Sequence, residues 1–149
     1  MITFDTDEGL AFKLKGVVKI RMWLRSVILD KGFKVGDLGY LFCSDDKILE
    51  VNRQYLGHDY YTDIITFDYV ERDIISGDMY ISIDTVQSNA EKFGVPFERE
   101  LLRVLVHGPL HLMGFKDKTD EDAAVMRKHE DMALQMYDTL KQRMMRGDQ

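Results

Sequence analysis

Cysteine and proline are scarce in this sequence, and long apolar runs are absent. Its 149 residues include one cysteine and two prolines, which excludes an intramolecular disulfide and a proline-rich linker. No stretch approaches the ~18 consecutive apolar residues that a membrane-spanning helix needs. The first residues lack the basic start and apolar core of a signal peptide. We therefore expect one domain over residues 1–149 that is soluble, cytoplasmic and not associated with a membrane.

Charge is distributed unevenly along the chain. The net charge of −6 by itself disfavours a polyanionic partner. Residues 10–36, however, contain seven basic residues and one acidic residue, a net charge of +6, which leaves −12 for the rest of the chain. This basic segment indicates either a nucleic-acid-binding surface or a solvated helix face, and charge alone does not separate the two. Arg21 and Arg25 lie in the segment and are candidate RNA contacts.

Hydrophobic periodicity predicts an α+β fold. Alternating or β-branched runs predict four strands, at residues 2–4, 38–43, 63–69 and 78–83. Helical spacing and capping residues predict five helices, which span about residues 17–32, 44–55, 84–94, 96–112 and 119–140. The expected N-caps are Ser44 or Asp45 for the second helix, Asp84 for the third, and Thr119 or Asp120 for the last. Residues 56–61 and 72–77 are predicted to be a loop and a turn. We expect a small mixed sheet of about four strands packed with about five helices, with a strand order that the sequence does not reveal.

The stretch from His107 to Asp117 has the spacing of a metal site. His107 and His111 are four residues apart, so on a helix their imidazoles lie on one face. Such a pair also occurs by chance, but Gly114 can end the helix and turn the chain back, which allows Asp117 to act as a third ligand. Three protein ligands and one open position for water are typical of catalytic zinc. We therefore predict that His107, His111 and Asp117 bind one Zn²⁺, or another divalent metal, and that metal-bound water is the reacting group.

The helix that carries the two histidines is apolar around most of its circumference, which predicts that it is buried. Pro109 cannot donate to the carbonyl of Leu105, so we expect a kink or local loosening at that turn. His129 is predicted to be a surface or core histidine, with a role as fourth ligand as the minor alternative. Asp63 and Asp78 are candidate proton acceptors, although solvated loop positions explain both residues better.

Gly108 argues against a peptidase. Zinc peptidases of the His-Glu-x-x-His type have a glutamate after the first histidine, and this glutamate is the general base. A glycine at this position cannot transfer a proton. A metallopeptidase is therefore a less favoured alternative, although the ligand spacing alone would permit it.

Several stretches, including residues 107–117, match one family pattern in order and spacing. The pattern His-Gly-x-Leu-His-Leu-x-Gly-[Tyr/Phe]-Asp-His is matched at His107, Gly108, Leu110, His111, Leu112, Gly114 and Phe115. Further matches are residues 49–57 with Asn52 and Tyr55, then Asp59, Thr62, Asp63, Thr66 and Phe67, then Gly77 and Asp78, and residues 98–101. In these stretches, which cover nearly the whole chain, the sequence resembles the YbeY family of metal-dependent endoribonucleases.

The resemblance implies an activity and a set of partners. The implied activity is hydrolytic cleavage of single-stranded RNA, with a role in maturing the 3′ end of 16S ribosomal RNA and in ribosome quality control. The implied partners are RNA, in particular rRNA, and the ribosome. The resemblance also implies a metzincin-like arrangement of the metal helix and the turn that follows it.

Two positions depart from the family pattern. Asp117 stands where the family more often has a third histidine; a carboxylate is a competent zinc ligand, and the more negative site favours harder metals such as Mn²⁺ more than three histidines would. Leu56 stands where the family commonly has an arginine that serves the RNA substrate. His58 and Lys116 are candidate substrate-binding residues that could replace this arginine.

A non-catalytic role is the main alternative. The chain would then be a ribosome-associated RNA-binding protein, in which a structural metal holds the fold and the basic N-terminal helix docks on rRNA. Cleavage of RNA that is lost in His111→Ala while RNA binding persists would favour the enzyme.

Overall fold

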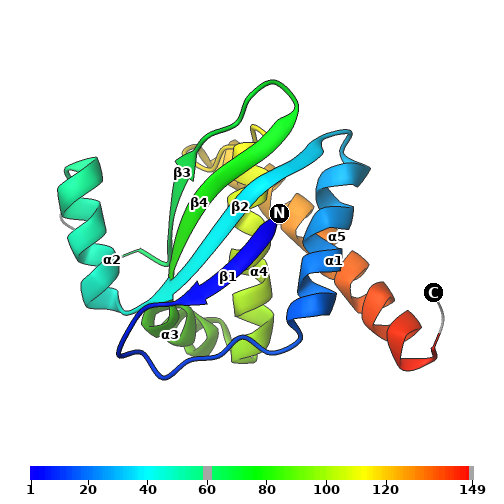
Figure 1. The fold of residues 1–149 in the computed structure, drawn as a ribbon, viewed down its shortest axis with the longest axis horizontal. Helices are drawn as coiled ribbons and strands as arrows, with labels where there is room; N and C mark the ends of the chain where they lie inside the picture. The colour runs from blue at the N-terminus through cyan, green and yellow to red at the C-terminus, as the bar shows by residue number, and fades with distance from the viewer. Residues whose placement is uncertain (59–61, 148–149) are drawn as a thin grey trace.

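The computed structural model describes residues 1–58 and 62–147, which form an α+β fold (Figure 1). The strands are β1 (Ile2–Thr6), β2 (Lys34–Cys43), β3 (Ile64–Asp68) and β4 (Ile74–Ser82). The α-helices are α1 (Val17–Asp30), α2 (Asp45–Val51), α3 (Ile83–Phe93), α4 (Phe97–Leu112) and α5 (Asp120–Met145), and a π-helical turn, Asn52–Leu56, follows α2. The predicted α+β class and the predicted sets of strands and helices are confirmed within these residues.

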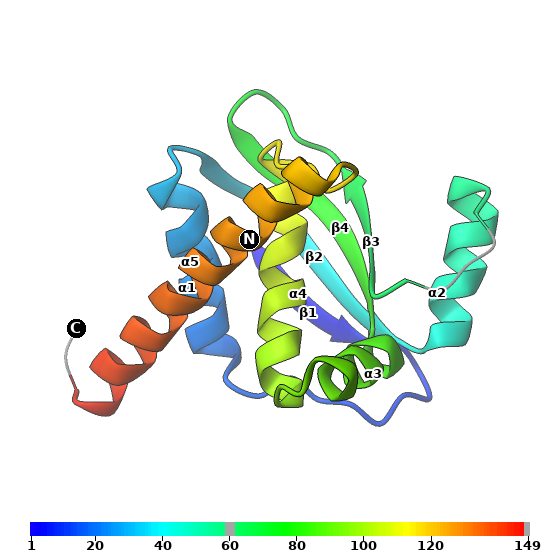
Figure 2. The same ribbon diagram turned by 180° about the vertical axis from the view of Figure 1, so that it is seen from behind.

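The sheet is mixed and has the strand order β1-β2-β4-β3. Strands β1, β2 and β4 are parallel, whereas β3 pairs antiparallel with β4 at one edge. Helices α1, α4 and α5 lie on one face of the sheet, which Figure 2 shows. The opposite face is turned toward the viewer in Figure 1, and α2 packs against part of it through Ile48 and Val51. Among the described helices, none combines the length and the apolar character needed to cross a membrane.

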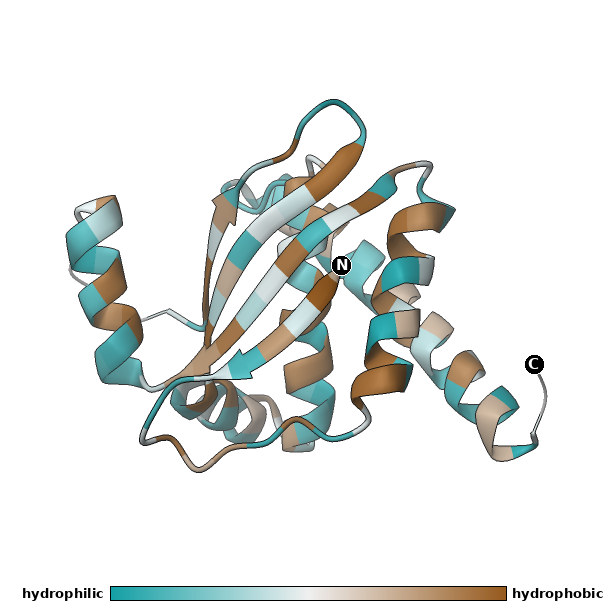
Figure 3. Cartoon of the chain, in the orientation of Figure 1, coloured by the Kyte–Doolittle hydropathy of each residue, from teal (hydrophilic) through white to brown (hydrophobic). Residues whose placement is uncertain are grey.

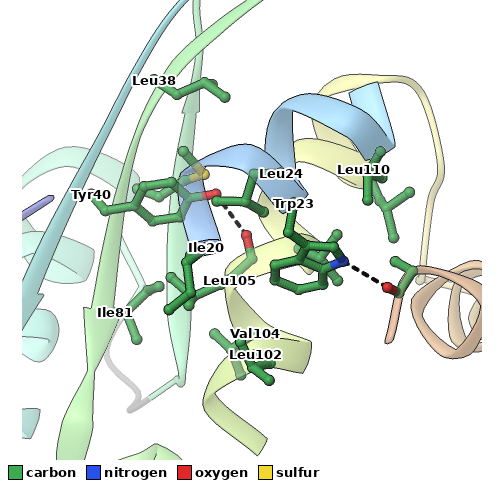
Figure 4. Packing of buried hydrophobic residues seen from close by; sticks show 14 of the residues in the cluster. Ile20, Trp23, Leu24, Leu38, Tyr40, Ile81, Leu102, Val104, Leu105 and Leu110 are labelled. Atoms are coloured by element: carbon green, nitrogen blue, oxygen red, sulfur yellow. Dashed lines mark hydrogen bonds between the residues drawn. The ribbon is translucent and has the colours of Figure 1, made fainter. Parts of the chain in front are cut away.

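The core lies between the sheet and the helices on its covered face. Apolar and polar residues alternate along the strands (Figure 3), and this alternation buries Leu38, Tyr40 and Phe42 of β2 on the helix side. In the same core, the indole Nε1 of Trp23 donates a hydrogen bond of 2.6 Å to the carbonyl of Ala133 (Figure 4). This bond joins α1 to α5 across a separation of 110 residues in the chain.

Helix α4 runs along the covered face of the sheet and also packs against α3 and α5 (Figure 2). Its close approach to the sheet depends on Gly108, because a Cβ atom there would overlap Met79 Sδ and lie 3.3 Å from Ile64 Cδ1. A glutamate side chain fits here only if the buried Met79 side chain moves. The packing therefore agrees with the sequence argument against a peptidase base at this position.

Pro109 lies inside α4, which continues through it to Leu112. Proline has no N–H group, so the carbonyl of Leu105 loses its normal helical partner. The buried hydroxyl of Tyr40 donates a hydrogen bond of 2.6 Å to this carbonyl (Figure 4). A hydrogen bond from β2 thus replaces the helical one that Pro109 removes. It satisfies the carbonyl and holds α4 against the sheet.

Replacement of Tyr40 by phenylalanine should destabilise the fold because it leaves the buried Leu105 carbonyl without a donor. We expect a loss of about 1–3 kcal/mol in the free energy of unfolding, measured by urea denaturation. In a Pro109→Ala background the new N–H of residue 109 can donate to the same carbonyl, so Tyr40→Phe should cost much less. Equal losses in the two backgrounds would show that the hydroxyl does not compensate for the proline.

The predicted start of β4 was wrong. Residues 72–77 were predicted to be a turn, but β4 already begins at Ile74, because Ile74 and Ile75 pair with Lys34 and Val35 of β2. This pairing joins residues distant in sequence, so local turn propensity does not reveal it.

The predicted caps were right in part. Ser44 and Thr119 cap α2 and α5 as expected, since each hydroxyl accepts a backbone N–H. Helix α3 is capped by Ser82 rather than by Asp84, whose carboxylate instead accepts the backbone N–H of Asp45. The predicted loop 56–61 begins one residue later than expected, since Leu56 ends the π-helical turn; residues 59–61 lie outside the described part of the chain.

Candidate metal site and active site

His107 is held by carboxylates on both sides of its imidazole ring. It lies on the buried helix α4, and its side chain is 22% exposed. The ring Nδ1–H donates a hydrogen bond of 2.6 Å to Oε2 of Glu130 on α5. The other ring nitrogen, Nε2, lies 3.3 Å from Oδ2 of Asp117. Glu130 therefore fixes the ring so that Nε2 faces the turn that follows α4.

The turn after α4 brings Asp117 to His107. Gly114 has φ 104°, a conformation that other residues rarely adopt. The backbone N–H of Phe115 then donates to the carbonyl of Leu110, which closes the helix end and reverses the chain. The reversal predicted at Gly114 is confirmed, and it explains how a residue ten positions after His107 can lie beside its ring.

The His107 and Asp117 donors have a separation that suits a metal ion. In a tetrahedral site with ligands at 2.0–2.1 Å, two donor atoms lie about 3.3 Å apart, as Nε2 and Oδ2 do here. A carboxylate on the remote nitrogen of a ligating histidine is also the usual arrangement at metal sites. These two residues therefore fit the metal that the sequence predicts.

His111 is on the next turn of α4 and is exposed. In the described part of the chain, no three His, Cys, Asp or Glu side chains lie together in a group that could hold a metal. The helix offset places His111 on the same face of α4 as His107. The three-ligand set thus stays a prediction.

Glu130 is itself held firmly. Its carboxylate is almost fully buried, and its Oε1 accepts a hydrogen bond of 3.0 Å from Arg103 on α4. The same guanidinium also donates to Asp131 at 2.7 Å. This network clamps α5 against α4 at the level of His107, and it fixes the orientation of the imidazole by charge-assisted hydrogen bonds.

A hollow of about 210 Å³ adjoins His107. Its charged lining consists of Asp63 at the start of β3 and of Glu100, Arg103, Arg127 and Glu130. Burial raises the pKa of Asp63, against the lowering effect of His107. Burial also raises the pKa of Glu100, and the Asp63 charge adds to this rise. Two carboxyl groups beside the histidine are therefore shifted toward their protonated forms.

The pKa of His107 is raised above its ordinary value of 6.5. Burial alone would lower this pKa, but the hydrogen bond and charge of Glu130 outweigh it, and the charges of Asp63 and Asp117 add to the rise. The carboxylates around His107 therefore favour a positive charge at this position.

Comparisons with known proteins show the family to which the chain belongs. The family model described as Endoribonuclease YbeY matches residues 13–138. The chain belongs to the YbeY family. Proteins named Endoribonuclease YbeY from Phocaeicola vulgatus and Flavobacterium psychrophilum are 59% and 46% identical to it, over 90% and 92% of this chain and 96% of each relative. A solution structure of a protein from Thermotoga maritima is similar over 93% of both chains, with a TM-score of 0.64 and 29% identity.

The YbeY signature residues occupy the end of α4 and the turn after it, so the motif that suggested the family also forms the centre of the site. The metzincin-like arrangement predicted for this helix and turn stays a prediction. Asp59, another residue of the resemblance, lies outside the described residues. Leu56, at the position where the family commonly has an arginine, is 42% exposed at the end of the π-helical turn.

The structure separates the two proposed proton acceptors. Asp63 was expected in a solvated loop, but it lines the hollow beside His107. It is therefore the better candidate for the proton acceptor. Asp78 points to the opposite face of the sheet: a Cβ on Gly39 would lie 2.7 Å from its Oδ1, whereas the neighbouring Met79 faces α4. The solvated alternative therefore holds for Asp78, which is exposed and lies on the wrong face of the sheet.

His129 is occupied by other contacts, as predicted for a structural histidine. Its Nδ1 lies 2.8 Å from Nζ of Lys31 and can accept from it, and its ring centroid lies 4.3 Å from that of Phe115. Burial lowers the pKa of His129, and the charges of Lys31 and Lys128 lower it further. His129 thus packs against the turn after α4, and its Nδ1 is engaged by Lys31.

The candidate RNA contacts are dispersed. Arg21 donates to the carbonyl of Ile2 at 2.9 Å, so its guanidinium is engaged at the edge of the sheet, whereas Arg25 is exposed on α1. Lys116 is exposed in the turn beside Asp117 and remains a candidate there. His58 is exposed just after the π-helical turn, where its backbone N–H donates to the carbonyl of Asn52. The assignment of these four residues to substrate binding stays a prediction.

Sequence reasoning missed Glu130, Arg103 and Glu100. Glu100, Arg103 and His107 are spaced three and four residues apart, which marks a polar stripe on an otherwise apolar helix. Glu130 follows Met126 by one helical turn on the buried side of α5, where a carboxylate requires a partner. Both signals were present in the sequence, but they become informative only when the two helices are known to be neighbours.

Replacement of Glu130 by glutamine should lower the pKa of His107, followed by NMR titration of the imidazole in chelator-treated protein. Because the pKa of His107 is higher in the folded than in the unfolded state, protonated His107 stabilises the fold. This contribution is complete at pH values below the unfolded-state pKa of 6.5 and is lost as the pH rises through the folded-state pKa. The variant should therefore lose about 1–3 kcal/mol at about pH 6, and less at about pH 9.

A matched control is Glu50→Gln, which alters an exposed carboxylate on α2. It should change neither the pKa of His107 nor the pH dependence of unfolding. An unchanged His107 pKa in Glu130→Gln would contradict the proposed clamp.

Proposed function

We propose that this YbeY-family protein is a metal-dependent endoribonuclease that hydrolyses single-stranded RNA, with His107, His111 and Asp117 as ligands of one Zn²⁺ or related divalent ion. We propose further that it acts in the cytoplasm, in 16S rRNA 3′-end maturation and ribosome quality control, with rRNA and the ribosome as partners. The observation that carries the proposal is the arrangement of His107, with Nδ1 on Glu130 and Nε2 facing Asp117.

The residues of the site have different proposed roles. A divalent metal held by His107, His111 and Asp117 would activate water at neutral pH and polarise a phosphoryl oxygen. Glu130 holds the imidazole of His107 in the orientation that leaves Nε2 available. Asp63 borders the same hollow with a raised pKa, so its carboxyl group can exchange a proton with the substrate or the leaving group.

The negative charge around His107 opposes the binding of RNA phosphates. Asp63, Glu100, Asp117 and Glu130 surround His107, and Arg103 and Arg127 line the same hollow. The carboxylates repel a phosphate, so the two arginines and the bound metal are the groups that can compensate for this repulsion. The predicted candidate Lys116 could add a further cation at the rim.

A non-catalytic RNA-binding role remains the second candidate because of Leu56. Its exposed apolar side chain cannot donate to a phosphate at the position where the family commonly has an arginine. Under this alternative, the metal stabilises the turn after α4, and the protein binds RNA without cleaving it. A metallopeptidase is disfavoured by the packing of Gly108 against Met79.

His111→Ala and Asp117→Ala should each reduce the affinity for zinc by more than about 100-fold, because each removes one of three ligands. Metal content after gel filtration and cleavage of a labelled single-stranded RNA should fall together. RNA binding measured by fluorescence anisotropy should persist in both variants. The control Asp46→Ala removes an exposed carboxylate on α2, away from the site, and it should retain metal and activity.

The outcomes separate the alternatives. Stoichiometric metal and RNA binding without any cleavage by the unmodified protein would favour the non-catalytic role. Retention of metal by both ligand variants would contradict the assigned ligand set.

A further inference from the structure

A second and larger hollow lies at the other end of α4. It has a volume of about 580 Å³ and is bordered by residues 11–16, the start of α1, the start of α4 and the second half of α5. We call it the basic groove. Phe97, which lines the groove, precedes His107 by ten residues along α4, so the groove lies roughly 15 Å from the metal site along the helix axis.

The charge of the basic groove is dominated by lysines. Lys13, Lys15, Lys19 and Lys141 line it, and no ion pair is found for any of them within the described residues. The other cation, Arg99, is neutralised by two hydrogen bonds to Asp138, of 2.8 and 3.0 Å. Glu98 is the remaining acidic residue of the lining, so the groove has an excess of positive charge on a protein whose net charge is −6.

Aromatic rings form part of the same lining. Phe12, Phe97 and Tyr137 border the groove and are only partly buried. The rings of Phe12 and Phe97 lie edge to face with centroids 6.2 Å apart, and Nζ of Lys19 lies 5.5 Å from the centroid of Tyr137. Cations beside partly exposed rings are the combination that single-stranded nucleic acids bind, through phosphate contacts and base stacking.

We propose that the basic groove binds the sugar-phosphate backbone of single-stranded RNA, outside the segment that is cleaved. The choice of RNA as the occupant rests on the proposed function, and the presence of an anion-binding groove does not. Lysine ammonium groups act as separate point charges, so they suit phosphates spaced along a flexible strand. Helices α1 and α4 both begin at the groove without a side-chain cap, and their positive ends add to the same field.

This assignment also separates the basic segment of the sequence into two parts. Lys13, Lys15 and Lys19 line the groove, whereas Arg21 is bonded to the carbonyl of Ile2. Lys141 comes from the opposite end of the chain. Part of the positive charge thus contributes to a concave site that includes a residue outside the segment, and part of it stabilises the edge of the sheet.

The test compares two double variants of the full chain. Lys15→Gln with Lys141→Gln removes two exposed charges of the groove, and Lys34→Gln with Lys92→Gln removes two exposed charges elsewhere. Binding of a labelled single-stranded RNA is measured by fluorescence anisotropy between about 50 and 200 mM salt. Loss of two phosphate contacts should reduce the slope of log K against log salt by about 1.4, and weaken binding about 25-fold at about 0.1 M salt.

The control double variant should leave both the affinity and the slope unchanged, and neither variant should alter the melting temperature. Equal slopes for the two double variants would overturn the proposal. Competition by polyglutamate as effective as competition by RNA of equal charge would also overturn it, since the groove would then suit an acidic polypeptide.

The result is distinguishable from failure of the proposed activity. If the unmodified protein cleaves no RNA but the groove variants bind RNA more weakly, the groove assignment stands and the nuclease proposal fails. If the groove variants bind and cleave RNA as the control does, the nuclease proposal stands and the groove assignment fails.

Discussion

The hydrogen bond from Tyr40 to the carbonyl of Leu105 determines where the histidine helix lies. Pro109 deprives this carbonyl of its helical donor, and a buried carbonyl without a partner is costly. The hydroxyl of a β2 residue supplies the missing donor from outside the helix. Leu105 lies two residues before His107 on the same helix. This bond therefore also fixes the distance of His107 from the sheet.

A second network acts on the other side of α4. The sheet positions the helix through Tyr40 and through the close approach of Gly108 to Met79. Helix α5 positions the imidazole through Glu130, which Arg103 holds in place. The imidazole is therefore placed by groups on three elements, and each group is itself packed or hydrogen-bonded. Such support is what a reactive site requires if its geometry is to be maintained.

The sequence allowed the elements, their types and the central motif to be predicted, because these depend on local periodicity and on spacing within one helix and turn. The reversal at Gly114 and the cap at Ser44 were predicted for this reason. The strand order and the start of β4 were not, because they depend on pairing between residues far apart in the chain. Glu130 was missed for the same reason: its function depends on a neighbour 23 residues away on another helix.

Helix α4 carries His107 toward one end and borders the basic groove at the other, so the length of this one helix fixes the separation between the two regions. An RNA strand anchored in the groove would therefore present the same nucleotide to the histidines at each encounter. The length of a helix would then determine where the strand is cut, independently of the base at that position. A nuclease built in this way is suited to producing a defined RNA end rather than to general degradation.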